Sequence, residues 1–246
     1  MIVATVSHYR QTPAYAPKLA HQLGIVDAAA YDISAACAGF SYAITQAEAL
    51  IRGGQAKYVL VVAGETLSDL TDLHDRGTAF LFGDGAGAVV LGGSDVNGIG
   101  PVVWGSDGGQ ENVIWQTADW HTAVETGVFP KLGMDGRAVF KWATSFIARA
   151  TKKCLDGAGL TPDQLDVFIP HQANDRITDT LLRYLKLPDS VVVARTIRQL
   201  GNNSAATVPM AMDALLTSGE AKSGQTALII GFGAGLVYAG QVITLP

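Results

Sequence analysis

Hydrophobic and polar positions follow two patterns along the chain, one typical of buried strands and one of helices. Strands are predicted at residues 2–7, 29–34, 57–65, 85–93, 100–106, 165–170, 191–196, 226–232 and 236–243. Helices are predicted at residues 16–24, 38–51, 136–158, 173–185 and 204–218. The helices at 38–51 and 204–218 are apolar nearly all round, which predicts that they are buried. This alternation indicates an α/β fold.

The same order of elements occurs twice. Residues 50–65 (LIRGGQAKYVLVVAGE) align with residues 215–233 (LLTSGEAKSGQTALIIGFG), each pairing the end of an apolar helix with a strand. This repeat predicts two similar α/β halves, residues 1–98 and 99–246, with mixed sheets packed around the buried helices.

The second half has an additional unit, the strand at 100–106 and the amphipathic helix at 136–158. The first half has no such unit, because Met1 stands directly before its strand. We therefore expect one face of the first sheet to be partly uncovered. Our hypothesis is that the chain is an N-terminally truncated form, which the reading frame upstream of Met1 would test.

Composition narrows the class of protein. Charged residues make up 16% of the 246 residues and apolar residues 48%, which excludes a disordered protein. A net charge of −5 argues against broad nucleic-acid binding. The two cysteines, Cys37 and Cys154, lack CxxC spacing, which excludes a disulfide scaffold and a cysteine-rich metal site. They suit a reducing compartment, and with no signal-peptide pattern we expect a cytoplasmic protein.

The last 24 residues are uncharged and long enough to span a membrane. However, glycines interrupt this segment, and its pieces TALII and LVYAGQVI are short and rich in strand formers. We predict two buried strands around a glycine turn, and no association with a membrane.

Three polar residues stand where a site would form. Cys37 lies in SAACAGF (34–40), between a strand and a buried helix whose N-terminus can lower a thiol pKa. An inert core cysteine is an equally good interpretation of Cys37, and the better one for Cys154. Asn202 lies at the corresponding turn of the second half, where a turn or N-cap residue is the alternative.

His171 ends a strand, at the sheet edge where α/β proteins bind ligands. His8 occupies the matching end of the first half, so the repeat alone leaves both histidines open. The other histidines are interpreted as non-catalytic: His21, His74 and His121.

The glycine cluster GFGAG (231–235) follows a strand, a position in which backbone N–H groups often bind an anion or oxyanion. A nucleotide-binding loop would open a helix, whereas a strand follows here. The cluster FGDGAG (82–87) fails the same test and is interpreted as a turn that packs against the site.

Five motifs together resemble β-ketoacyl-acyl carrier protein synthase III of the thiolase fold: SAACAGF, DRGTAFLFGDGAGAVVL (75–91), PHQANDRI (170–177), GNNSAATVP (201–209) and GFGAG. Thiolases use a second cysteine and the elongating synthases two histidines. Cysteine, histidine and asparagine together indicate the priming synthase or its chalcone-synthase-like relatives, which typically carry GFGPG.

The resemblance implies that Cys37 takes an acyl group from acyl-CoA as a thioester. The N–H groups of Cys37 and Ala234 would form the oxyanion hole. His171 and Asn202 would hydrogen-bond the malonyl thioester carbonyl and stabilise the enolate formed as CO₂ leaves. No metal or external cofactor is implied.

The resemblance also implies a homodimer that binds acyl-CoA and an acidic acyl carrier protein, and hence a local basic patch. Arg176 and Arg183, two turns apart on one helix face, are its core, and Lys141 is a further candidate. Arg76 matches a residue that contacts CoA. The remaining candidates for carrier or CoA contact are Gln172, Ala173, Asn174 and Asp175.

Three departures from the family pattern bear on specificity. The family chain begins well before Met1, Asn203 replaces a threonine, and the segment 120–134, which borders the acyl pocket, is short. We expect the Asn203 change to have a small effect. Phe232 would border the acyl pocket, and Thr12 would reach into the pocket of a partner subunit.

We therefore expect a condensing enzyme that starts fatty-acid chains. Two alternatives stay open: a ketosynthase of the same fold that primes a polyketide, and a non-catalytic remnant that only dimerises or binds carrier protein.

Overall fold

The computed structural model describes all 246 residues, Met1–Pro246, and contains two mixed sheets of related topology. The first has the order β2-β1-β3-β4 and comprises β1 (Ile2–Ala4), β2 (Tyr31–Ile33), β3 (Tyr58–Thr66) and β4 (Asp84–Gly92). The second has the order β5-β11-β10-β8-β9 and comprises β5 (Val103–Ser106), β8 (Val167–Pro170), β9 (Val192–Val193), β10 (Thr226–Gly233) and β11 (Val237–Thr244). In each sheet the first three strands of the repeat are parallel and the fourth is antiparallel.

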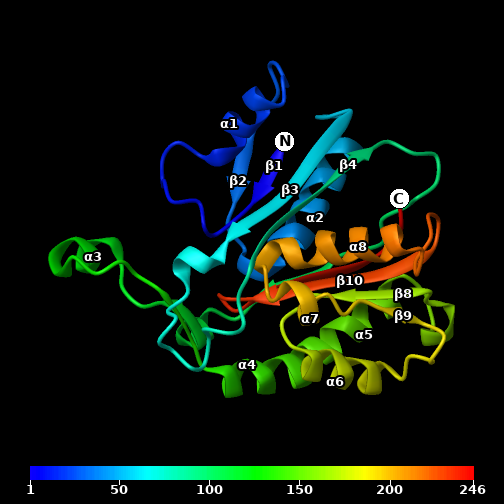
Figure 1. The fold of residues 1–246 in the computed structure, drawn as a ribbon. Coiled ribbons are helices and arrows are strands. Elements are labelled where there is room, and N and C mark those ends of the chain that lie inside the picture. Colours follow the sequence, from blue (N-terminus) through cyan, green and yellow to red (C-terminus); the bar gives the residue numbers. More distant parts are fainter.

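The elements form five layers, α/β/α/β/α (Figure 1). Helices α2 (Gly39–Arg52) and α8 (Thr207–Ser218) lie between the two sheets. Helix α1 (Tyr15–Gln22) covers the outer face of the first sheet, and α5 (Ala148–Gly157) with α6 (Asp175–Leu185) covers that of the second. This is the two-halved, thiolase-like architecture that the repeat predicts.

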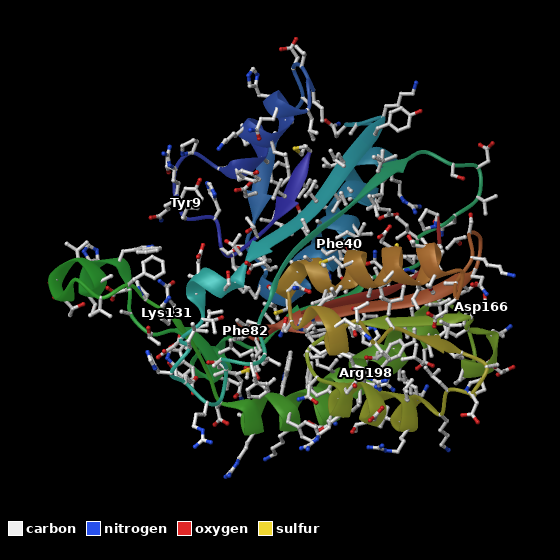
Figure 2. The ribbon with its side chains drawn as sticks, viewed as in Figure 1. Tyr9, Phe40, Phe82, Lys131, Asp166 and Arg198 are labelled. Atoms are coloured by element: carbon white, nitrogen blue, oxygen red, sulfur yellow. The ribbon has the colours of Figure 1, made fainter.

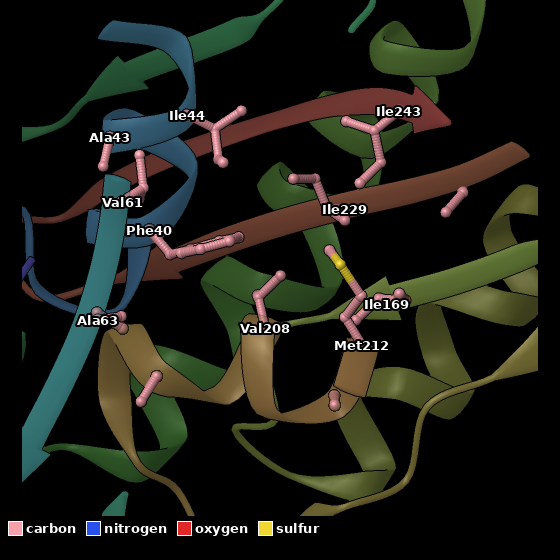
Figure 3. Packing of buried hydrophobic residues seen from close by; sticks show 14 of the residues in the cluster. Phe40, Ala43, Ile44, Val61, Ala63, Ile169, Val208, Met212, Ile229 and Ile243 are labelled. Carbon is pink, nitrogen blue, oxygen red and sulfur yellow. The ribbon is translucent and has the colours of Figure 1, made fainter. Parts of the chain in front are cut away.

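The largest core cluster, 23 buried residues, fills the space between the sheets around α2 and α8. Phe40 of α2 and Met212 of α8 pack there against Ile229 of the second sheet (Figure 3). Both helices were predicted to be buried because neither has a polar face, and this is confirmed. They hold the turns that precede them fixed between the sheets.

The outer face of the first sheet is less covered than that of the second. Only four buried residues form the core under α1, whereas 17 form the core under α5 and α6. β4 alternates between partly buried and exposed residues, while β11 is mostly buried. The expected open face of the first sheet is therefore present.

Several elements depart from the predictions. The helix predicted at 136–158 is divided into α4 (Gly136–Trp142), a π-helical turn η4 (Ala143–Ile147) and α5. The sequence patterns missed a hairpin of β6 (Ile114–Gln116) and β7 (Leu132–Met134), which carries α3 (Trp120–Thr126), and the short α7 (Ile197–Leu200). Short 3-10 turns complete the structure: η1 (Ala36–Ala38), η2 (Leu67–Leu70), η3 (Gly108–Val113), η5 (Pro162–Gln164) and η6 (Ser204–Ala206).

The uncharged C-terminal segment forms strands β10 and β11, as predicted. None of the helices combines the length and apolar character needed to cross a membrane.

Candidate active site

Two turns of the same backbone shape carry Cys37 and the Asn202 region. Ala36 and Ser204 both have left-handed backbone conformations, with φ of 43° and 48°, which are uncommon for residues with a side chain. Each opens a short 3-10 helix, η1 or η6, which leads directly into α2 or α8. Alignment of the two turns places Ala205 at the position equivalent to Cys37. The repeat therefore brings two strained turns together in the middle layer.

A cavity with about 860 Å³ of empty space opens at these turns. Cys37, His171 and Asn202, the three predicted catalytic residues, all lie in its wall, together with Phe232 and Ala234. Most of the remaining wall is apolar and comes from the hairpin, α4 and neighbouring segments. The cavity therefore combines a thiol, an imidazole and an amide with a largely apolar surface suited to an acyl chain.

The GFGAG motif lies directly against the nucleophile. A side chain at Gly233 would place its Cβ 2.8 Å from both Cβ and Sγ of Cys37, and one at Gly231 would stand 2.8 Å from the Cys37 carbonyl oxygen. Glycine is required at both positions by this close approach. The N–H groups of Cys37 and Ala234 donate no backbone hydrogen bond to the rest of the chain, so both are available to an oxyanion.

The Cys37 side chain is in the cavity wall but surrounded by packed groups. Burial raises the pKa of the Cys37 thiol to about 12, and the Ser204 hydroxyl and its own backbone N–H offset this only in part. Desolvation therefore outweighs any lowering of this pKa by the helix N-terminus. With this raised pKa the free thiol keeps its proton at neutral pH.

His171 is held by three different contacts. Its backbone N–H donates to the Ile230 carbonyl at 2.7 Å, its Nδ1 lies 2.7 Å from Thr207 Oγ1, and the ring meets Phe232 edge to face. The side chain is 3% exposed, and burial lowers its pKa to about 3. His171 is therefore neutral at physiological pH and acts as a hydrogen-bonding group.

The amide of Asn202 has a defined orientation. Its Oδ1 accepts the Ser204 N–H at 2.9 Å, which leaves the Nδ2 hydrogens as donors. The Asn202 backbone pairs with the 81–83 segment, through its N–H to the Leu81 carbonyl and its carbonyl to the Gly83 N–H. Phe82 and Gly83 thus pack against the site, as predicted for the 82–87 cluster (Figure 2). The prediction that the whole cluster is a turn is wrong, because residues 84–87 form the start of β4.

Asn203, the departure from the family pattern, points away from the cavity. Its Nδ2 donates to the Asp84 and Leu200 carbonyl oxygens at 2.9 and 3.0 Å, and it does not line the wall. This position supports the expected small effect of the change.

The structure separates the candidates for carrier or CoA contact. Arg76, Lys141, Arg176 and Arg183 are all exposed, as a docking patch requires, and none lines the cavity. Ala173 and Asn174 lie in the cavity wall, where Asn174 also caps α6 by accepting the Arg176 N–H.

Two of these candidates are assigned a different role by their contacts. Gln172 is 1% exposed and spends its side chain on the Pro170 and Ala194 carbonyls and on the Ile197 N–H. The Gln172 amide therefore connects the loop after β8 to the segment before α7. The prediction that it contacts a carrier protein or CoA is wrong, because the side chain is buried and all these hydrogen bonds are internal.

Asp175 forms ion pairs with Arg195 and Arg198, at 2.9 and 2.6 Å, so its carboxylate is occupied by contacts within the chain. Arg198, on α7, is more than half exposed, and its Nε is paired with the Asp175 carboxylate (Figure 2). Reading the sequence missed Arg198, because nothing in its neighbourhood predicts its approach to α6.

The histidine left open by the repeat is resolved by geometry. His171 lines the cavity, whereas His8 does not and has its Nε2 3.3 Å from the Pro13 carbonyl oxygen. Thr12 is exposed and outside the cavity wall of its own chain. Its approach to a partner's cavity stays a prediction.

Two further site residues were missed. Trp142 of α4 lies in the cavity wall and packs against Phe232 with ring centroids 6.2 Å apart. Thr207, the first residue of α8, contacts His171. Trp142 belongs to the amphipathic helix predicted at 136–158, and only the folded chain shows that its side of the helix borders a cavity.

Comparison with known proteins gives one consistent family. A family model described as 3-oxoacyl-[acyl-carrier-protein] synthase III matches residues 31–108, and the model of its C-terminal part matches residues 155–245.

The β-ketoacyl-[acyl-carrier-protein] synthase III of Streptomyces glaucescens is 57% identical over 248 residues, which cover 100% of this chain and 74% of the relative. The synthase III of Mycobacteroides abscessus is 49% identical, with the same coverage.

Solved structures agree. The priming β-ketosynthase of the R1128 polyketide biosynthetic pathway superimposes with a TM-score of 0.97 at 46% identity, covering 100% of this chain and 74% of that one. The 3-oxoacyl-(acyl carrier protein) synthase III of Pseudomonas aeruginosa PAO1 gives 0.92 at 35% identity, covering 100% and 76%.

Proposed function

The chain belongs to the 3-oxoacyl-[acyl-carrier-protein] synthase III family of acyltransferases, and we propose that it condenses an acyl-CoA starter with malonyl-acyl carrier protein. The observation that carries the proposal is the meeting of Cys37, His171 and Asn202 in one apolar cavity. The product is a 3-oxoacyl group on the carrier protein, and the reaction is the first condensation of fatty-acid synthesis.

In the first half-reaction the Cys37 sulfur attacks the thioester carbonyl of acyl-CoA. The carbon–sulfur bond to CoA breaks, and the thiol proton leaves with the CoA sulfur. The N–H groups of Cys37 and Ala234 stabilise the oxyanion. Because the Cys37 pKa is high, proton loss accompanies attack instead of preceding it.

In the second half-reaction His171 and Asn202 donate hydrogen bonds to the malonyl thioester carbonyl. The carboxylate leaves as CO₂, its bonding electrons form the enolate, and the enolate carbon attacks the acyl group on Cys37. The bond to Cys37 breaks, and the thiolate that leaves takes a proton from water. The reaction as proposed requires no metal or external cofactor, because the thioester and the loss of CO₂ supply the driving force.

We propose that the exposed arginines Arg176, Arg183 and Arg198, with Lys141, dock the acidic carrier protein, and that Arg76 contacts CoA. The exposure of all five side chains supports this proposal. We also propose a homodimer acting in the cytoplasm, in which Thr12 reaches the partner's cavity. Sedimentation of the purified chain tests the dimer, and a monomer at working concentration would exclude it.

The direct test of the function is intact-protein mass, with peptide mapping, after incubation with acetyl-CoA or isobutyryl-CoA. One acyl adduct on Cys37 is expected, and none in Cys37→Ser. His171→Ala should still acylate but fail to condense with malonyl-acyl carrier protein. Equal loss of both half-reactions in His171→Ala would overturn the assigned roles. A folded chain that never acylates would favour a non-catalytic protein that only dimerises or binds carrier protein.

A polyketide-priming ketosynthase is the second candidate, favoured by the TM-score of 0.97 with the R1128 priming enzyme. The chemistry is the same, and the difference lies in the starter unit and carrier protein. The preferred adduct mass and competition between carrier proteins of the two pathways separate these functions.

A further inference from the structure

Thr207 lies between His171 and the Ser204 carbonyl group. Its Oγ1 is 2.7 Å from His171 Nδ1 and 2.9 Å from the Ser204 oxygen. Thr207 is 1% exposed and His171 3%, so bulk water does not compete for these contacts. The protonation of the imidazole is therefore coupled to the orientation of one hydroxyl.

A threonine hydroxyl has one hydrogen to donate, so the two contacts are alternatives. If it donates to the Ser204 carbonyl, it must accept a hydrogen bond from Nδ1–H, and Nε2 is then the unprotonated nitrogen, a base. If it donates to Nδ1, the ring proton is on Nε2, which is the nitrogen left available to the cavity. The Ser204 carbonyl also accepts the Thr207 backbone N–H, so it keeps a partner in either case. Thr207 is the one group within hydrogen-bond distance that can donate to the lone pair of Nδ1.

We propose that Thr207 is a positioning residue, which donates its hydroxyl hydrogen to Nδ1 of His171 and so keeps the ring proton on Nε2. This rests on the proposed function, in which Nε2–H donates to the malonyl thioester carbonyl. The low pKa of His171, about 3 because of burial, keeps the ring neutral, so at working pH only one nitrogen carries a proton. The hydroxyl then decides whether His171 is a donor or a base.

Nitrogen-15 NMR of histidine-labelled enzyme tests the proposal without reference to activity. The His171 signals are assigned by their loss in His171→Gln. The expected spectrum at pH 7 has Nε2 protonated and Nδ1 unprotonated. A proton on Nδ1 would overturn the proposal and make Nε2 a base facing the cavity. This result stands whether or not the wild-type chain acylates Cys37, so it is distinguishable from failure of the proposed function.

Kinetics of the separate half-reactions give the second test. Thr207→Val removes the hydroxyl at nearly constant shape and should slow malonyl decarboxylation and condensation about tenfold, the size of one net hydrogen bond. Acylation of Cys37 should stay within about twofold, and Thr207→Ser should restore condensation.

Thr151→Val is the matched control, because its buried hydroxyl donates to the Ile147 carbonyl at 2.7 Å, away from the site. Condensation by Thr207→Val at the wild-type rate would overturn the proposal. If that variant does not fold, the NMR measurement on the wild type still decides.

Discussion

Val90 and Val242 occupy equivalent positions of the two halves, yet their surroundings differ. Val90 of β4 pairs with Leu60 of β3, and Val242 of β11 pairs with Leu228 of β10, the repeat equivalent of Leu60. Val90 is 68% exposed, whereas Val242 is 7% exposed. A valine at the same position of the repeat thus lies on an open face in the first sheet and in a core in the second.

The difference arises outside the repeated elements. β5 pairs with β11, and α5 packs over it, whereas no strand pairs with the free edge of β4. Four buried residues form the outer core of the first half against 17 in the second. Sheet order therefore follows from the repeat, while burial depends on what is packed against each sheet.

The largest effect on activity is expected for a substitution at Gly233 in β10. The equivalent position of the first half, in β3, holds Glu65. Gly233→Ala would place a Cβ 2.8 Å from the Cys37 sulfur. It should lower Cys37 acylation by about 100-fold or more, because the oxyanion hole is displaced. The rate of acylation is measured by quenching the reaction at set times and recording the adduct by mass spectrometry. Gly157→Ala, with open space around its Cβ, is the control, and equal rates in both variants would contradict the close approach.

The unequal outer cores predict unequal losses of stability. Leu181→Ala in α6, fully buried in the 17-residue cluster, should lower the free energy of unfolding by about 2–5 kcal/mol. Leu19→Ala in α1, only partly buried against four residues, should cost less than half as much. Urea unfolding measures both. Equal losses would mean that the outer face of the first sheet is packed as well as that of the second.

Replacing each of the paired valines by threonine sharpens the comparison directly. Val242→Thr buries a hydroxyl and should cost about 1–3 kcal/mol. Val90→Thr on the exposed face should change stability by no more than about 0.5 kcal/mol. The same unfolding experiment serves, and a comparable cost at Val90 would show that its face is covered in solution.

The smallest effect concerns Glu65, whose Oε2 accepts hydrogen bonds from Thr5, Val6 and Ser7 while Oε1 has no partner. Burial raises the pKa of Glu65 above its ordinary value of 4.5. Ionisation of Glu65 then costs the folded state more than the unfolded chain, so wild-type stability falls as pH rises above 4.5 through the folded pKa.

Glu65→Gln keeps an acceptor oxygen but cannot ionise. Its stability relative to wild type should therefore increase from pH 4 to pH 8, as measured by denaturant unfolding at several pH values. Parallel pH profiles of the two proteins would show that Glu65 does not titrate over this range.

Much of this structure follows from local patterns. The buried α2 and α8 were predicted because neither has a polar face, and the sheet strands because their apolar runs are short and bounded by glycine. Their places at a helix start and a strand end made Cys37 and His171 candidates, and the resemblance of the surrounding motifs then chose between them and the alternatives. These features depend on neighbours in sequence, which periodicity reports.

The remainder depends on contacts between distant segments. Gln172 stands in a motif beside His171, but its burial depends on Ala194 and Ile197. The raised thiol pKa of Cys37 could not be predicted from sequence, because its desolvation comes from distant segments packed around it. Thr207 gave no signal, since a threonine opening a helix is ordinarily only a structural residue.

The left-handed turns at Ala36 and Ser204 have a consequence for stoichiometry. The second turn repeats the backbone that presents Cys37, yet Ala205 at the equivalent position is 1% exposed and lies in the central core. The only other thiol, Cys154, is fully buried as well. A molecule with two matching turns thus has a single thiol in the cavity wall, and the proposed function predicts one acyl group per chain at a time.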